Sequence, residues 1–325
     1  MRPKLQKQSV QPKGHKLKFA GRIIPQSGGY NTPQQTREMF PKLALGLIPV
    51  ICIYLIRNKG IYWKAESMRA IFISDAHLKF ARDDRYGQLI NFLNDIKNGK
   101  ARFLINSEDK DKELCSIDDL YIVGDLFDFW FCDSQNIYHE FKPIISKLIE
   151  LQKSGIRIHL CEGNHDFFLR EYFHDVLGMY VYEEWADLKL DNLRVLIAHG
   201  DTADKTNIKY ILFRKFLRSS FFYRIQSLIP SSIRWTLASF SSSTSKEMTI
   251  ERGDVLVEKM LSFAINKFQE NYDAVIVGHC HKPFMHHYTI AGKRKTFVAL
   301  GDWISRYSFL YYENGKFYLE YYRSC

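Results

Sequence analysis

Five short apolar runs, each ending in polar residues, set the pattern of the chain from residue 70 onward. They are AIFISD, DLYIVGD, IRIHLCEGN, RVLIAHGD and DAVIVGH. Runs of this length predict buried strands, and helical patterns over residues 86–97 and 140–153 lie between some of them. This alternation predicts a layered α/β fold. We therefore expect the polar residues at the carboxyl ends of the strands, where open α/β sheets bind ligands.

Two other regions depart from this alternation. Residues 203–255 are apolar, aromatic and basic together at roughly helical spacing, which predicts a helical insertion between two strands. Beyond residue 285 the chain consists of strand-like segments rich in Tyr and Phe. Within that part Asn314-Gly315 predicts the turn of a β-hairpin.

The first 67 residues differ in composition from the rest of the chain. They contain 12 Lys and Arg against 2 Asp and Glu, so they carry the whole formal charge of +10. Residues 1–40 have few large apolar side chains, which predicts disorder. An apolar run over 43–56 is shorter than the roughly 20 residues of a spanning helix and contains Pro49. We expect a basic leader over 1–67 and a folded domain over 68–325.

Three interpretations of the leader stay open. Met68 directly precedes the first predicted strand, so it is a candidate for the true start of the protein. Alternatively, the apolar run is a peripheral membrane anchor, or a cleaved export signal, although no small-residue cleavage site follows it. The six cysteines form no CxxC pair and no regular framework, which indicates free thiols in a reducing cytosol.

Candidate metal ligands follow all five predicted strands. In chain order they are Asp75, His77, Asp125, Asn164, His199, His279 and His281. Alternation along a strand would send Asp75 and His77 to one side, and likewise His279 and His281. Imidazole, carboxylate and amide groups suit Mn²⁺, Fe or Zn²⁺. Seven ligands exceed the needs of one ion, which predicts two ions that share Asp125 and act together on a phosphoryl group.

The order of these motifs resembles a known family. D-x-H, G-D, G-N-H-D, H-G and G-H-x-H are the pattern of calcineurin-like metallophosphoesterases, and the resemblance covers about residues 70–305. It implies a four-layer αββα β-sandwich with two divalent ions per chain. The family pattern would assign Asp75, His77, Asp125 and His281 to one ion. It would assign Asp125, Asn164, His199 and His279 to the other.

The insertion over 203–255 bears on the substrate. Its aromatic side chains alternate with cations such as Arg214, Arg218 and Arg224, as in a helix at a membrane interface or a chamber for acyl chains. In the other interpretation, the aromatics only pack on the domain. The segments GDLFDFW, AHGDT and Ser245-Lys246-Glu247 resemble the UDP-2,3-diacylglucosamine hydrolases of lipid A biosynthesis.

That second resemblance implies a reaction and a location. The reaction is Mn²⁺-dependent hydrolysis of the pyrophosphate of UDP-2,3-diacylglucosamine to UMP and 2,3-diacylglucosamine 1-phosphate. The enzyme would act in the cytoplasm, peripherally on the inner face of the inner membrane. The implied substrate contacts are Trp130, Asn164, His165, Asn207, Tyr210, Ser245, Thr249, Arg252 and His279. Asn207, Thr249 and Arg252 replace the usual Asp, Asn and Lys.

His165 is the most consequential departure, because the best-known lipid hydrolases carry Arg there. A protonated His can contact a phosphate and can also deliver a proton to a leaving oxygen. We interpret His165 mainly as a phosphate contact, with general-acid chemistry as a second role. The neighbouring Asp166 is expected to orient its ring, so both residues are candidate catalytic groups.

Two alternative functions stay open. The first is another dinuclear-metal phosphoesterase, such as a nucleotide phosphodiesterase, a nuclease or a protein phosphatase. A domain without net charge or a basic stripe argues against a nucleic-acid partner, and the apolar insertion argues against a phosphoprotein groove. The second is a non-catalytic scaffold that binds a membrane or a partner, although all seven ligand positions are filled. No obligate protein partner is indicated.

Overall fold

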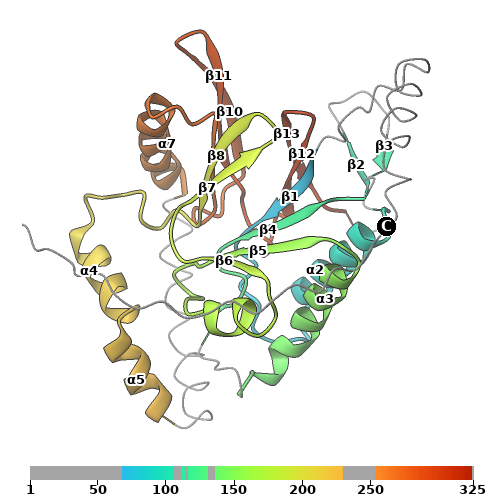
Figure 1. Cartoon of the computed structure of the whole chain (residues 1–325), viewed down its shortest axis with the longest axis vertical. Helices are drawn as coiled ribbons and strands as arrows, with labels where there is room; N and C mark the ends of the chain where they lie inside the picture. The colour runs from blue at the N-terminus through green and yellow to red at the C-terminus, as the bar shows by residue number, and fades with distance from the viewer. Residues whose placement is uncertain are drawn as a thin grey trace, which may run out of the picture. The chain divides into compact units, whose positions relative to one another are not determined.

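The computed structural model describes residues 68–100, 102–104, 111–113, 116–130, 136–229 and 253–323 (Figure 1). The predicted leader, with its apolar run over 43–56, lies outside these residues. The stretch 230–252 of the predicted insertion also lies outside them. Within the described residues, no helix is long and apolar enough to cross a bilayer.

Two large sheets form the frame of the domain. The first has six strands, in the order β13 (Lys316–Tyr321), β12 (Ser308–Glu313), β1 (Arg69–Ile73), β4 (Asp119–Val123), β5 (Arg157–Cys161) and β6 (Tyr180–Tyr182). The second has five, in the order β10 (Phe284–Ile290), β11 (Lys293–Ala299), β9 (Ala274–Val277), β8 (Leu193–Ala198) and β7 (Ala186–Leu190). A separate two-stranded ribbon pairs β2 (Arg102–Leu104) with β3 (Asp111–Glu113). The five predicted strands are thereby confirmed as β1, β4, β5, β8 and β9.

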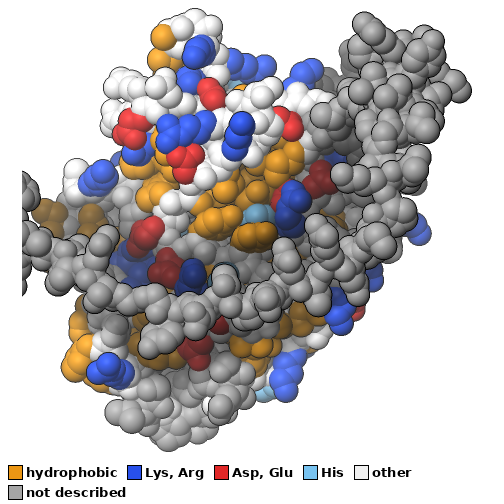
Figure 2. Space-filling model, in the orientation of Figure 1, with side chains coloured by type: hydrophobic (Ala, Val, Ile, Leu, Met, Phe, Trp, Pro, Cys, Tyr) orange, Lys and Arg blue, Asp and Glu red, His pale blue; other side chains and the backbone are white. Residues whose placement is uncertain are grey.

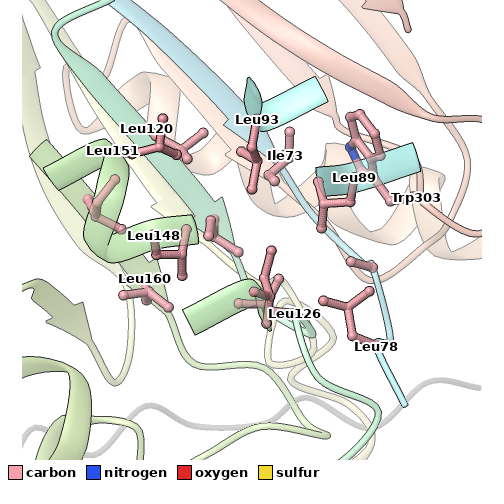
Figure 3. Packing of buried hydrophobic residues seen from close by; sticks show 14 of the residues in the cluster. Ile73, Leu78, Leu89, Leu93, Leu120, Leu126, Leu148, Leu151, Leu160 and Trp303 are labelled. Carbon is pink, nitrogen blue, oxygen red and sulfur yellow. The ribbon is translucent and has the colours of Figure 1, made fainter. Parts of the chain in front are cut away.

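Alternate residues of the strands face two different layers. In β1, Ala70 and Phe72 pack between the sheets, whereas Ile71 and Ile73 pack under α2 (Asp84–Lys97) and α3 (Lys142–Lys153). Figure 3 shows the leucines of both helices against the first sheet. The outer face of the second sheet, including Val275 of β9, packs against α7 (Gly253–Gln269). The layers run helix, sheet, sheet, helix, which confirms the expected αββα sandwich.

The helices begin and end where local chemistry favours it. Asp83 caps α2 by accepting a hydrogen bond from the backbone N–H of Arg85. Gly99 and Gly155, with φ of 64° and 99°, follow the ends of α2 and α3. A 3₁₀ turn, η1 (His139–Phe141), precedes α3, and one π turn, η2 (Arg170–His174), follows β5. The insertion begins with α4 (Ile208–Leu217) and α5 (Ser220–Leu228).

Two of the hairpins at the edges of the large sheets turn through a residue followed by glycine. The predicted turn is confirmed: Glu313 pairs with Lys316, and Asn314 and Gly315 have φ of 53° and 73°. The hairpin between β10 and β11 was not predicted. It turns in the same way through Ala291 and Gly292, with φ of 50° and 72°. Alanine carries no sequence signal for a left-handed conformation, because it tolerates that region poorly.

A row of four aromatic rings crosses the first sheet between directly paired residues of adjacent strands. Phe72 stacks on Tyr121, Tyr121 on His159 and His159 on Tyr180, at centroid distances of 4.6, 4.2 and 4.6 Å. The row runs from fully buried Phe72 to Tyr180, which is 50% exposed on the edge strand. Cross-strand ring pairs add to stability beyond the area that they bury.

The two ends of this row should respond differently to truncation. We expect Phe72→Ala to lower the free energy of unfolding by about 3–5 kcal/mol, because it opens a cavity between the sheets. Tyr180→Ala should cost no more than about 1 kcal/mol, since solvent already reaches that ring. Equilibrium urea unfolding of both variants measures the difference. Equal losses would contradict this burial gradient.

Candidate metal centre

The seven predicted ligands meet at one edge of the sandwich. Asp75 and His77 follow β1, Asp125 follows β4, and Asn164 follows β5, all in the first sheet. The second sheet contributes the three remaining histidines: His199 follows β8, and His279 and His281 follow β9. Loops from both sheets therefore converge, as expected from the strand pattern.

One group of ligand atoms forms around Asp75. Its Oδ1 lies 3.4 Å from His281 Nε2 and 3.9 Å from His77 Nε2. His77 Nε2 is also 3.6 Å from Asp125 Oδ2. Asp75 Oδ1 and His77 Nε2 are buried and have no hydrogen-bond partner. Such atoms are costly unless something coordinates them, so these residues fit a cation.

A second group forms around His199. Its Nε2 lies 2.9 Å from Asn164 Oδ1, 3.1 Å from His279 Nδ1 and 3.3 Å from Asp125 Oδ2. Asp125 Oδ2 thus faces both groups, while Asp125 Oδ1 accepts a hydrogen bond from the backbone N–H of His165 at 2.9 Å. A carboxylate that serves two metal ions must lie between both sets of ligands, and Asp125 Oδ2 has this position.

Strand alternation does not explain this convergence, so that part of the prediction is wrong. β1 ends at Ile73 and β9 at Val277, before the paired ligands begin. Asp75, His77, His279 and His281 instead adopt left-handed backbone conformations, with φ of 56°, 46°, 66° and 53°. Each such residue costs roughly 1–2 kcal/mol. Strain of this kind is typical of functional sites that the surrounding fold holds in place.

Two motif glycines make room for the ligands. A Cβ on Gly163 would lie 2.0 Å from Asp125 Oδ1, and one on Gly278 would lie 1.9 Å from Ser74 Oγ. Ser74 in turn donates a hydrogen bond to Asp75 Oδ2, which also accepts from the backbone N–H of His279 at 2.9 Å. These contacts fix Asp75 and leave its Oδ1 directed at the first group.

Burial and charge set the protonation of the imidazoles. Burial lowers the pKa of His77 and lowers the pKa of His279 to about 3, so both rings are neutral, as ligands must be. Burial also opposes the charge on His199, but the adjacent Asp125 carboxylate outweighs it and raises the pKa of His199 to about 10. Without a cation His199 therefore holds a proton, which a bound ion would displace.

Asp166 does not orient His165, which corrects the prediction. Its carboxylate is fully buried and accepts hydrogen bonds from the backbone N–H groups of Asp125, Phe127 and Gly163 at 2.9, 3.1 and 2.9 Å. The ring of His165 instead contacts the carbonyl oxygen of Asp128 through Nδ1 at 2.9 Å. Asp166 therefore binds the loops after β4 and β5 together, and a substrate cannot reach it.

Trp130 is likewise buried. Its side chain is only 1% exposed and packs against Phe127, Phe141 and Phe173 in the core under the first sheet. This burial does not support the expected substrate contact, because Phe127 and the more distant Phe141 and Phe173 enclose the ring. Its backbone N–H does reach the site, by donating to the carbonyl of His165 at 3.2 Å.

The remaining predicted substrate contacts divide into two sets. Asn207, Tyr210 and His279 line one hollow beside the second group of ligands, together with Lys259 and Met260 of α7, which the sequence did not predict. Tyr210 donates its hydroxyl hydrogen to Asp201 Oδ2 at 2.7 Å. The other set, Ser245, Thr249 and Arg252, lies outside the described residues.

Arg214 of α4 and its C-cap residue Arg218 form ion pairs with the domain and do not lie among the exposed apolar side chains. Arg214 donates from Nε to Asp201 Oδ2 at 2.7 Å, and Arg218 donates from a terminal nitrogen to Glu162 Oε2 at 2.6 Å. Both therefore bind the domain, which corrects their predicted place among lipid-facing cations. Ile211, Leu217 and Phe222 are half-buried, but the other described apolar side chains of α4 and α5 are exposed and so do not merely pack on the domain: Ile208, Leu212, Phe213, Phe216, Phe221 and Ile225. Figure 2 shows hydrophobic side chains at the surface over α5, at the lower left.

Asp128 is a site residue that the sequence reasoning missed. Its Oδ1 lies 3.6 Å from His77 Nδ1, on the far side of the ring from the first group, and its carbonyl contacts His165. Carboxylates in this position commonly orient metal-binding imidazoles. Its position three residues after Asp125, in GDLFDFW, was the available signal.

The sandwich and the paired groups of His, Asp and Asn at its edge define a hydrolase of the metallophosphoesterase class. The family model of calcineurin-like phosphoesterases matches residues 68–283, and the chain belongs to this family. Its members act with divalent metal ions.

Three curated relatives of this chain carry the same name. A UDP-2,3-diacylglucosamine hydrolase from Vibrio atlanticus is 28% identical over 258 residues, which cover 78% of this chain and 97% of that protein. One from Photorhabdus laumondii is 30% identical over 240 residues, covering 73% and 91% of the two chains. One from Proteus mirabilis is 32% identical over 186 residues, covering 57% and 77%.

Gly163→Ala should disrupt the centre without unfolding the domain. The added methyl group would collide with Asp125 Oδ1, so we expect loss of most bound metal and of phosphodiesterase activity. Gly87→Ala is the matched control. No atom lies within 4 Å of its added Cβ on α2, so it should keep the metal and gain up to about 1 kcal/mol of stability. Metal content by mass spectrometry and the melting temperature are the measurements. Full metal content in Gly163→Ala would refute the steric argument.

Proposed function

We propose that this chain hydrolyses the pyrophosphate of UDP-2,3-diacylglucosamine and releases UMP and 2,3-diacylglucosamine 1-phosphate. The observation that carries the proposal is the match to relatives of that name over as much as 97% of their length. The exposed apolar residues of α4 and α5 agree with a substrate that has acyl chains. The reaction belongs to lipid A biosynthesis.

In this proposal, two divalent ions, most simply Mn²⁺, occupy the two groups. Asp75, His77 and His281 hold the first, and Asn164, His199 and His279 hold the second, with Asp125 between them. The support is that each group places its ligand atoms close together around one shared carboxylate oxygen. Such a pair of ions supplies an activated water and neutralises the charge on the phosphoryl oxygens.

His165 contacts the phosphate in this proposal. Because the carbonyl of Asp128 can only accept, Nδ1 of His165 is the hydrogen-bearing nitrogen. The ring can therefore donate from Nε2 only when it is doubly protonated. In that form it stabilises phosphate charge and can pass a proton to the leaving oxygen. Asn207 and Tyr210, in the hollow beside His279, are the proposed contacts to the sugar end of the substrate.

The proposed location is the cytoplasmic surface of the inner membrane. The exposed apolar side chains of α4 and α5 suit a peripheral contact with a lipid surface, from which the substrate would also be drawn. The paired arginines of α4 are bound to the domain, so the contact would be mainly apolar.

The substrate assignment is tested by product formation. With Mn²⁺ the wild-type chain should release UMP from UDP-2,3-diacylglucosamine much faster than it hydrolyses bis(4-nitrophenyl) phosphate, as followed by chromatography. Asp125→Asn should lower kcat by more than about 100-fold, beyond the cost of losing an outer-shell partner, because both groups lose a shared charge. If only the small diester were cleaved, another phosphoesterase activity would be the better assignment.

The membrane contact has its own test. The double variant Phe213→Ser/Phe221→Ser should bind vesicles of phosphatidylethanolamine and phosphatidylglycerol several-fold more weakly, because it removes two exposed rings from the apolar face. Tyr321→Ser, which removes a 49% exposed ring from the edge strand β13, should bind like the wild type. Co-sedimentation of the full chain measures both. Unchanged binding of the double variant would place the contact elsewhere.

A further inference from the structure

Helix α4 rests on both loops that carry ligands of the second group. Tyr210 and Arg214 are spaced four residues apart and share one face of the helix, and Arg218, the C-cap residue, continues the same spacing. Arg214 and Tyr210 both bind Asp201, two residues beyond His199. Arg218 binds the loop after β5, which carries Asn164. One helix of the insertion therefore contacts the backbone neighbourhoods of two proposed ligands.

Arg218 makes the more direct of these connections. One terminal nitrogen donates to Glu162 Oε2 at 2.6 Å and to the carbonyl of Glu183 at 3.0 Å. The other donates to the carbonyl of Gly163 at 2.8 Å. The side chains of Arg218 and Glu162 are only 13% and 3% exposed, so solvent screens the ion pair little. The guanidinium carbon of Arg218 lies 5.5 Å from the centroid of the Phe167 ring.

Gly163 is thereby held from two sides. Its N–H donates to the buried Asp166 carboxylate at 2.9 Å, and its carbonyl accepts from Arg218. The next residue along the chain is Asn164, whose Oδ1 lies 2.9 Å from His199 Nε2. Fixing the peptide group between Gly163 and Asn164 fixes the direction in which the Asn164 side chain leaves the backbone.

We propose that Arg218 is a positioning residue that holds Asn164 in the second metal group and couples the seating of α4 to that group. The inference rests on the proposed role of Asn164 as a ligand, and not on the identity of the lipid substrate. Arginine suits this task because its planar fork serves several acceptors at once, whereas a lysine is a single point of charge. Loss of an outer-shell partner of this kind typically weakens metal binding or activity by about 10–100-fold.

The test separates this role from simple support of the insertion. Mn²⁺ binding by isothermal titration calorimetry and kcat on bis(4-nitrophenyl) phosphate are measured for Arg218→Met and Arg218→Lys. The small diester has no acyl chain, so lost contacts to such a chain cannot affect its hydrolysis. Lys215→Met is the control, because it removes one exposed positive charge from the same helix.

We expect Arg218→Met to bind the more weakly held of the two Mn²⁺ ions about 10–100-fold less tightly. Its kcat on the small diester should fall by a similar factor. Arg218→Lys should fall between this variant and the wild type, and Lys215→Met should match the wild type. Circular dichroism and melting curves verify that each variant is folded. If Arg218→Met does not fold, the affinity of Arg218→Lys decides the question.

Two results would overturn the inference, and they are distinguishable from failure of the proposed function. Wild-type Mn²⁺ affinity and diester turnover in Arg218→Met, or in Arg218→Lys if only that variant folds, would leave Arg218 with a role in the insertion alone. This holds even if hydrolysis of the lipid nucleotide is lost. A wild-type chain that binds no Mn²⁺ would instead refute the metal centre itself.

Discussion

The structure of the site depends on bringing one carboxylate oxygen between two sets of ligands. Asp125 Oδ2 lies 3.6 Å from His77 Nε2 and 3.3 Å from His199 Nε2, so small displacements would break one side. Its other oxygen and its backbone N–H are held by His165 and Asp166. Gly163 approaches it so closely that an added Cβ would collide with Asp125 Oδ1, and Asp125 itself adopts a left-handed conformation with φ of 51°.

The strands and the ligand set could be predicted from sequence because each motif is local. An apolar run buries a strand, and the polar residues that follow it must lie at the strand end. The direction of a loop side chain is not local, so Asp75 and His77 converge for a reason that alternation does not supply. The expected roles of Trp130 and Asp166 have no support for the same reason. Contacts with residues distant in the sequence pack Trp130 in the core and bind the Asp166 carboxylate to backbone N–H groups.

The cations of α4 teach a narrower lesson about amphipathic helices. Arginines among aromatic residues resemble a membrane-facing surface when composition alone is considered. Helical spacing separates them, because Arg214 and Arg218 share a face with Tyr210, whereas Leu212, Phe213 and Phe216 point to solvent. The face that carries charge binds the domain, and the apolar face is the exposed one. Among the described residues of the insertion, the ion pairs of Arg214 and Arg218 attach α4 to the domain, and apolar side chains of α4 and α5 form the exposed surface.

The ligands come from both sheets, and this has a consequence for the stability of the fold. A cation held between Asp125 and His199 would link the two sheets at the edge of the sandwich. The described strands of one sheet form no hydrogen-bonded pair with strands of the other sheet. Any ion that binds only the native state stabilises it by mass action. Resistance to heat would then follow the supply of divalent ions in the cell, so that scarcity would threaten the amount of folded protein as well as its turnover.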